Sequence, residues 1–308
     1  MLSEIIRLSL TNAIFAATFR LACPLLFAAM GGCFNSASGC ANLSYEAVML
    51  YACFFSVVGS YYSGSPWIGL LSGMGIGVVI SIVFGLMSMV FHSNMMIAAI
   101  ALNSTAWAVT TMLMVVIFGT RGTVYDPKIK SFKTIHFKWM EKIPLIDEIF
   151  NNNVVLVYIA FVLVIIAYIV MYHTPFGLRI RGIGQNENAA QTAGVDVNRY
   201  RWISLILMGA FTGISGTFLS LSGISMFVEN MTAGKGFLAM ISITIGKGNP
   251  FLIFLVCLLF AYSQALVLVL GSLSIPTQII ATIPYVAVVL VLFVDGIKKF
   301  KGMADIEL

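Results

Sequence analysis

Long apolar runs occupy most of this chain and contain very few charged residues. Hydrophobic residues make up 60% of its 308 residues and charged residues 9%, whereas about a quarter of a soluble globular domain is charged. Apolar runs of about 20 residues span the hydrocarbon core of a bilayer as helices. Their continuity argues against a membrane barrel, whose strands alternate between apolar and polar residues. We therefore predict an all-α, polytopic integral membrane protein in which residues 1–308 form a single transmembrane domain.

The apolar runs predict about eight or nine helical crossings, some of them broken or re-entrant. Residues 31–47 are small and polar and separate two apolar runs. Residues 222–250 have to contain a crossing that connects the runs on either side. Their own apolar run, 237–245, is too short to span a bilayer alone. Irregular backbone at that depth is tolerated only against protein or along a watery path, so both interruptions are candidates for a path through the membrane.

Three polar residues near the first interruption and in the fourth apolar run are candidates for that path. Asn42 and Glu46 lie within residues 31–47, and Asn103 lies in the run 95–118. A carboxylate or an amide inside a bilayer costs free energy unless it faces a cavity or a polar partner. Two alternatives stay open. Glu46 would lie at the membrane interface with its carboxylate in water, and Asn103 would make a structural hydrogen bond between helices.

Small residues recur at every fourth position of the run 65–90, which predicts a helix face that packs closely against a neighbour. The pattern does not distinguish a neighbour in this chain from one in another subunit. The residues are Gly69, Gly73, Gly77, Ser81 and Gly85.

Two polar loops have to lie on opposite sides of the membrane, because one apolar run separates them. Residues 121–153 carry charges of both signs, and their apolar part predicts a short amphipathic helix on the membrane surface over 137–149. Residues 174–201 and the tail after the last run have basic residues close to span ends, which favours the cytoplasm. We therefore expect 174–201 inside and 121–153 outside. The basic residues are Arg179, Arg181, Arg199, Arg201, Lys298, Lys299 and Lys301.

The loop 174–201 has the local signals of a short helix. Asn186 can cap its first turn, Glu187 suits the positive end of the helix dipole, and Gly194 can end it in the left-handed conformation. A helix of about two turns is unstable alone in water, so we expect it to be held by the adjacent spans and pressed against another protein. The alternative is an ordinary solvated loop.

This loop resembles the coupling helix of a known family, the membrane permease subunits of ABC importers, in the nucleoside branch of the branched-chain amino acid and sugar permeases. In that family a loop of the form G-x-N-x-x-A-A-x-x-x-G-[IV]-x-V docks into a groove of the cytoplasmic ATPase. The matching positions are Gly184, Asn186, Ala189, Ala190, Gly194, Val195 and Val197. The resemblance implies that coupling to the ATPase involves Gly184, Asn186, Glu187, Ala189, Ala190 and Gly194.

Residues 229–237 resemble the same family more sharply, through its motif E-N-M-T-x-G-x-G-F. The resemblance extends to the turn at Gly246, Asn249 and Pro250 and to Pro284 and Tyr285. Glu229, Asn230 and Thr232 would exchange hydrogen bonds with ribose hydroxyls or base edges, and the glycines would let backbone approach. The alternative is that Glu229 is an ordinary interface residue and the glycines only break a helix.

The family's motif near residues 31–47 is only half kept. Gly39, Asn42 and Glu46 match it. The family's acidic and arginine positions and its two late glycines are replaced here by Gly32, Ser36, Ala37, Ser44 and Ala47. These replacements weaken a substrate assignment based on this motif.

The resemblance implies a permease subunit of an ATP-driven importer for nucleosides or related purine and pyrimidine compounds, in a bacterial inner or plasma membrane. Its partners would be cytoplasmic ATP-binding subunits, a second, related permease subunit and an extracytoplasmic substrate-binding lipoprotein. The chain has no G-x-x-x-x-G-K-[ST] phosphate loop, so we expect no ATPase site and no enzyme activity of its own.

Other binding chemistries have little support in the sequence. The five cysteines lack the spacing of a metal site, and we expect neither a metal nor a cofactor. The net charge of +5 comes from a few loops rather than a basic stripe with interleaved aromatics, which argues against nucleic-acid binding.

Two other functions remain open. One is a sugar or amino-acid permease of the same superfamily, which would differ in its cavity residues. The other is an ion-coupled secondary transporter, which would more often carry ionisable residues deep in several spans.

Overall fold

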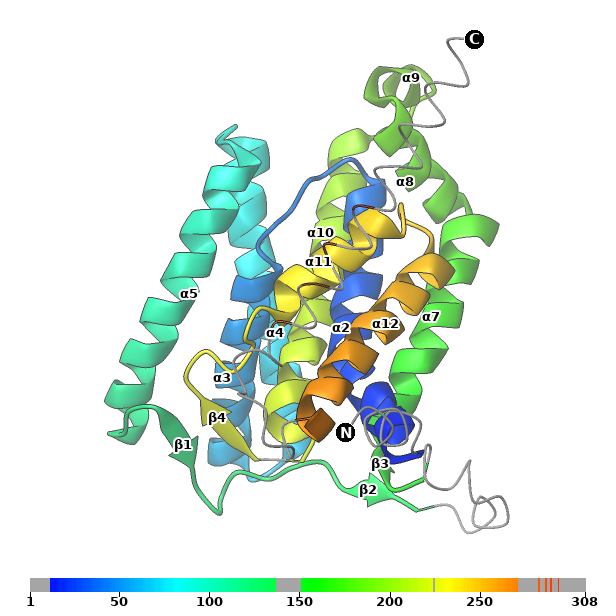
Figure 1. Ribbon diagram of the computed structural model, residues 1–308. Coiled ribbons are helices and arrows are strands. Elements are labelled where there is room, and N and C mark those ends of the chain that lie inside the picture. Colours follow the sequence, from blue (N-terminus) through cyan, green and yellow to red (C-terminus); the bar gives the residue numbers. More distant parts are fainter. Residues whose placement is uncertain are drawn as a thin grey trace.

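Long helices running roughly along one axis form most of the computed structural model, which describes residues 12–136, 151–223 and 225–270 and the single residues 282, 286, 289 and 293 (Figure 1). Two short strand pairs close the end opposite α9, β1 with β4 and β2 with β3. The helices are α2 (Asn12–Ala37), α3 (Tyr45–Ser63), α4 (Pro66–Gly85), α5 (Met95–Phe118), α7 (Val155–His173), α8 (Pro175–Gln185), α9 (Glu187–Thr192), α10 (Val197–Leu221), α11 (Lys235–Ile245) and α12 (Pro250–Leu270). The strands are β1 (Thr123–Tyr125), β2 (Thr134–Ile135), β3 (Asn153–Val154) and β4 (Met226–Val228), and a π-helical turn, η1 (Leu86–Val90), extends α4.

Within the described residues, six helices are long and apolar enough to cross a bilayer: α2, α4 with η1, α5, α7, α10 and α12. The all-α polytopic fold with interrupted helices is therefore confirmed. The expected surface helix at 137–149, the connection 271–276 and the basic tail lie outside the described residues, as does nearly all of the last span, 278–294. The total of about eight or nine crossings stays a prediction.

The first interruption is shorter than the sequence suggests. Helix α2 continues to Ala37, so only residues 38–44 are irregular, whereas the expected break begins at residue 31. Gly31 and Gly32 lie inside α2 because they allow close packing: a Cβ on Gly31 would come within 2.7 Å of the Phe211 side chain. The irregular segment descends from the end of α2 to the start of α3 (Figure 1).

The second interruption lies between β4 and α11. Helix α11 has 11 residues, too few to cross a bilayer at 1.5 Å per residue. In Figure 1 it rises at a slant from the middle of the bundle towards the end that carries α8. The expected re-entrant segment is therefore present.

The small residues of α4 face two helices of the same chain. All five of them are buried. A Cβ on Gly77 would collide with the carbonyl oxygen of Gly209 in α10, and one on Gly69 would lie 2.7 Å from the carbonyl oxygen of Ser56 in α3. The close-packing face is thus internal to this chain, which answers a question that the sequence leaves open.

The two polar loops lie at opposite ends of the bundle, as predicted. Helices α8 and α9 are at the top of Figure 1, the strands formed by residues 123–135 are at the bottom, and α7 connects the two ends. Which end faces the cytoplasm stays a prediction from the charge rule.

Replacing Gly77 by alanine tests the close contact of α4 with α10. We expect Gly77→Ala to cost about 1–3 kcal/mol of stability, because the new methyl group meets rigid backbone. Gly75→Ala is the matched control, since nothing lies within 4 Å of a Cβ there. Thermal unfolding of the detergent-purified protein measures both; equal unfolding temperatures for the two variants would contradict this packing.

Candidate functional site

The carboxylate of Glu46 joins the two interruptions. Its Oε1 accepts hydrogen bonds from Thr232 Oγ1 at 2.5 Å and from the Gly234 amide at 2.9 Å, and its Oε2 accepts one from the Gly236 amide at 2.8 Å. The Glu46 residue is only 9% exposed. It does not reach a surface as the interfacial alternative requires.

Two helix starts meet at this carboxylate. Glu46 lies in the first turn of α3, and its acceptor atoms satisfy amides at the first turn of α11. The first amides of a helix have no partner within the helix, and its amino end carries a partial positive charge. The carboxylate therefore stabilises the first turns of both helices, and these amides need no water as a hydrogen-bond partner.

Glycines make this approach possible. A Cβ on Gly236 would lie 2.5 Å from the amide nitrogen of Glu46 and 2.7 Å from its Cα. Gly234 has a φ of 80°, a left-handed conformation that favours glycine. The G-x-G pattern thus lets the backbone of the second interruption touch the beginning of α3.

Asn103 holds the start of α3 from the side of α5. Its Oδ1 accepts from the Ala47 amide at 2.9 Å, and its Nδ2 donates to the Leu43 carbonyl at 3.1 Å. Both polar ends of the side chain are therefore used within the protein. The geometry is that of the structural hydrogen bond between helices.

Glu229 fastens the second interruption to α5. Its Oε1 accepts from Trp107 Nε1 at 3.1 Å and from Thr111 Oγ1 at 2.9 Å. Trp107 and Thr111 are not among the path residues predicted from the sequence. The available signal was their spacing, since Asn103, Trp107 and Thr111 are four residues apart and share one helix face.

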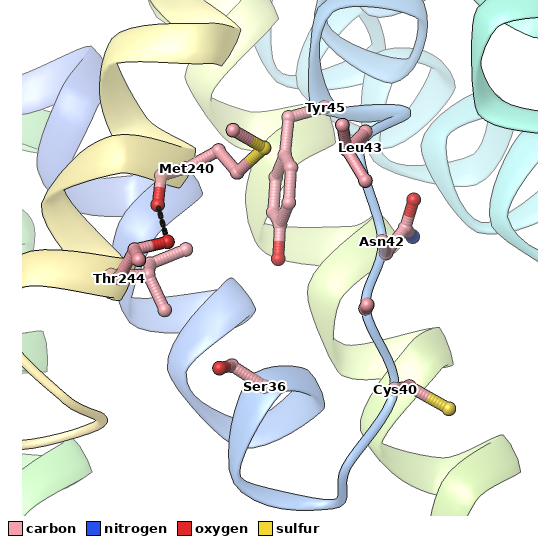
Figure 2. A pocket seen from close by; sticks show the side chains of 9 residues that line it. Ser36, Cys40, Asn42, Leu43, Tyr45, Met240 and Thr244 are labelled. Carbon is pink, nitrogen blue, oxygen red and sulfur yellow. Dashed lines mark hydrogen bonds between the residues drawn. The ribbon is translucent and has the colours of Figure 1, made fainter. Parts of the chain in front are cut away.

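A cavity of about 240 Å³ lies between the first interruption and α11 (Figure 2). Asn42 lines it; its Oδ1 accepts from the Ser44 amide at 2.8 Å, whereas its buried Nδ2 has no hydrogen-bond partner among the described residues. The ring of Tyr45 lies between the 40–43 segment and Met240. Because this Nδ2 is buried, the segment 38–44 has to move before a bound molecule can accept a hydrogen bond from it.

The remaining predicted path residues differ in exposure. Thr232 is fully buried against Glu46, whereas Asn230 is exposed in a left-handed conformation with a φ of 56°. The structure therefore brings Glu46, Thr232 and Asn103 together at the two breaks. Asn42 lies beside the cavity, and Glu229 and Asn230 lie where the second break begins, directly after β4.

The short helix in the loop 174–201 forms as its capping signals predict. Helix α9 has six residues; Asn186 Oδ1 accepts from the Ala189 amide at 3.1 Å, and Gly194 has a φ of 79°. Ala190 faces inward and packs with Ile183 and Val197. The exposed residues of this helix and its end are small or polar: Asn188, Ala189, Gln191, Thr192, Ala193 and Gly194.

Helix α9 is linked to the beginning of the first interruption. The carboxylate of Glu187 accepts from both terminal nitrogens of Arg201, at 3.1 and 2.8 Å, and Arg201 Nε donates to the Ser38 carbonyl at 3.5 Å. Gly184 contacts the Ala37 carbonyl so closely that a Cβ there would collide with it. The loop and the break therefore share contacts.

The family model described as "Branched-chain amino acid transport system / permease component" matches residues 14–294. The chain belongs to this permease family. No group of three or more His, Cys, Asp or Glu side chains that could hold a metal ion occurs in the part of the permease that the structure describes.

Two curated relatives cover nearly the whole permease. It is 29% identical to the guanosine ABC transporter permease protein NupQ of Bacillus subtilis, over 96% of this chain and 93% of NupQ. It is 30% identical to the nucleoside ABC transporter permease protein NupC of Lactococcus lactis subsp. cremoris, over 92% of each chain. Among solved structures, PsaBC from Streptococcus pneumoniae in complex with Fab has a similar fold, with a TM-score of 0.53, 15% identity and coverage of 94% and 95% of the two chains.

Removing the Glu46 carboxylate tests its role at the breaks. We expect Glu46→Ala to destabilise the permease by about 3 kcal/mol or more, because three buried donors lose their acceptor. Glu46→Gln keeps one acceptor oxygen and should be less destabilising. Thermal unfolding in detergent measures both effects.

Glu229→Ala is the comparison for this experiment. Its lost donors belong to the side chains of Trp107 and Thr111, which can turn towards other acceptors, whereas the amides of Gly234 and Gly236 are fixed in the backbone. If Glu46→Ala unfolds no earlier than Glu229→Ala, the carboxylate of Glu46 does not hold the breaks together.

Proposed function

We propose that this permease is the membrane subunit of an ATP-driven ABC importer for nucleosides or related purine and pyrimidine compounds. The observation that carries the proposal is the link between the exposed helix α9 and the broken helices beside the cavity, through Glu187, Arg201 and Ser38. It supports a device in which movement at one end of the bundle changes a site within it. The names of NupQ and NupC support the nucleoside class.

The six path residues have two roles in this proposal. Glu46, Thr232 and Asn103 hold the interruptions in place and do not contact substrate directly, because their polar atoms are bonded within the protein. Glu229 and Asn230 have polar atoms available to hydroxyls and base edges, and the buried Nδ2 of Asn42 would become available when the segment 38–44 opens. Glu229 Oε2 accepts no hydrogen bond from the described residues, so it can accept one from a nucleoside.

The coupling helix is α9, and the residues that would take part in coupling lie in it or beside it: Gly184, Asn186, Glu187, Ala189, Ala190 and Gly194. Its small exposed face would fit a groove in a cytoplasmic ATP-binding subunit, which places residues 174–201 in the cytoplasm and 121–153 outside. Closure of the ATP-binding subunits would displace α9. The displacement would reach Ser38 through Arg201 and open or close the segment 38–44.

A second permease subunit would complete the path. The cavity of about 240 Å³ is smaller than the pockets of about 300–1,000 Å³ that usually enclose small ligands. An extracytoplasmic binding lipoprotein would deliver substrate at the end that carries the strands. ATP hydrolysis would belong to the ATP-binding subunits, and the complex would lie in a bacterial inner or plasma membrane.

Uptake by bacteria that lack their own nucleoside importers tests this function. With its partner subunits expressed alongside, the permease should confer uptake of labelled guanosine or uridine that excess unlabelled nucleoside prevents. Excess ribose, glucose or leucine should leave uptake unchanged. Depletion of ATP with the ion gradient intact should stop uptake.

Each alternative function has its own outcome in that experiment. Transport of ribose, glucose or leucine in place of nucleosides would identify a different substrate class within the same superfamily. Uptake that persists without ATP would identify an ion-coupled transporter instead.

The link from α9 to the first interruption has its own test. We expect Glu187→Gln and Arg201→Gln to reduce uptake several-fold, because each breaks the paired hydrogen bonds between the two residues. The double variant should be no worse than Arg201→Gln alone, since that substitution already removes the bonds to Glu187. Arg199→Gln is the control, as Arg199 is exposed. Additive losses in the double variant would refute the link.

A further inference from the structure

A second cavity, of about 330 Å³, lies at the end of the bundle that carries α8 and α9. Its walls come from the ends of α2 and α7, from α8 and from the turn between α11 and α12. The residues that line it include two cations, Arg181 and Lys247, and no acid. None of the lining residues carries a negative charge that would neutralise Arg181.

Arg181 differs from the other arginines of the same loop. Arg201 binds Glu187, and Arg179 donates to the Tyr200 hydroxyl at 2.6 Å. Arg199 is exposed to solvent. Arg181 makes no hydrogen bond or ion pair with the described residues, and its Nε is buried without a partner.

Tyr172 holds the Arg181 guanidinium in place. The guanidinium carbon lies over the Tyr172 ring, 4.6 Å from its centre, a cation–π contact that restrains the position of the group. Stacking leaves the in-plane N–H donors of the guanidinium free for an acceptor. Arg181 is half-buried, and its buried Nε has lost water without gaining a partner, so an anion that accepts from this guanidinium would be stabilised here.

The depth of this cavity indicates which anion fits. Met171 and Tyr172 directly precede His173, the last residue of the span α7 (Val155–His173), and both line the cavity. The end of a spanning helix lies where hydrocarbon gives way to lipid headgroups. Tyrosine is enriched at this level, and basic pockets between spans bind anionic headgroups there.

We propose that this cavity binds a phosphate group, held by Arg181 and supported by the charge of Lys247, and that the group belongs to the headgroup of an anionic phospholipid. Free phosphate has the same chemistry and is the other possible source. A phosphodiester accepts two hydrogen bonds from one guanidinium, which matches its planar fork. The bound lipid would join α8 to the ends of α2 and α7, next to the link between Gly184 and Ala37.

Native mass spectrometry of the full-length permease tests the proposal. The protein is purified in mild detergent, stripped of lipid and titrated with phosphatidylglycerol, with phosphatidylcholine or with inorganic phosphate. We expect phosphatidylglycerol to bind at least about tenfold more tightly than phosphatidylcholine, the size of effect that one charge-assisted bidentate contact gives.

Variants of the loop arginines connect that binding to the cavity. Arg181→Gln should lose the preference for phosphatidylglycerol, and Arg181→Lys should keep only part of it, because lysine has the charge without the fork. Arg199→Gln should bind like the wild type. Gel filtration and the unfolding temperature without lipid show whether each variant is folded. If Arg181→Gln does not fold, the comparison is made with Arg181→Lys.

The outcomes separate the two sources of phosphate and the failure of the proposal. Loss of phosphatidylglycerol binding in Arg181→Gln, with no competition from inorganic phosphate, establishes a lipid site. Binding of inorganic phosphate that displaces the lipid, and is lost in Arg181→Gln, assigns the cavity to a soluble phosphate. Equal phosphatidylglycerol binding by wild type and Arg181→Gln, with no effect of phosphate, overturns the proposal.

Discussion

The carboxylate of Glu46 is the constraint on which the two interruptions depend. Breaking a helix inside a bilayer leaves backbone amides without partners, and each costs several kcal/mol in hydrocarbon. Here one carboxylate accepts from Thr232, Gly234 and Gly236 and lies in the first turn of α3. The same interaction that offsets the cost of the breaks also fixes the distance between them. A movement of one break therefore requires a movement of the other.

The position of α5 follows from the same geometry. This helix packs mainly on α3 and has only slight contact with α4, so one side of it stands apart from the bundle (Figure 1). Its polar contacts run to both breaks, from Asn103 to the start of α3 and from Trp107 and Thr111 to Glu229. Because Glu229 also follows β4, which pairs with β1 beyond the end of α5, a displaced break and a displaced α5 accompany one another.

Local signals predicted the fold well, whereas contacts between distant residues were beyond the sequence. Helix α5 has the predicted bounds, because Asn94 caps it and Gly119 ends it in the left-handed conformation. The predicted first break begins too early in the chain. A sequence does not distinguish a glycine that ends a helix from one that lets a neighbouring helix pack closely, as Gly31 does. The partners of Glu46 could not be predicted: Thr232 is 186 residues away, and no local period connects them.

The link from α9 to the first break has to be more than an ion pair. The side chains of Glu187 and Arg201 are 43% and 21% exposed, and ion pairs in such surroundings contribute about 0–1 kcal/mol. An interaction of that size changes a rate several-fold but cannot by itself carry a large displacement. The contact between Gly184 and the Ala37 carbonyl is different, because backbone against backbone has no side chain to yield. The hydroxyl of Ser204 in α10 donates to the hydroxyl of Ser38, which directly follows α2, and so adds a third contact in this region. In the proposed mechanism, close packing of Gly184 on Ala37 would therefore transmit a movement of α9, and the ion pair would only help to hold α9 against α10.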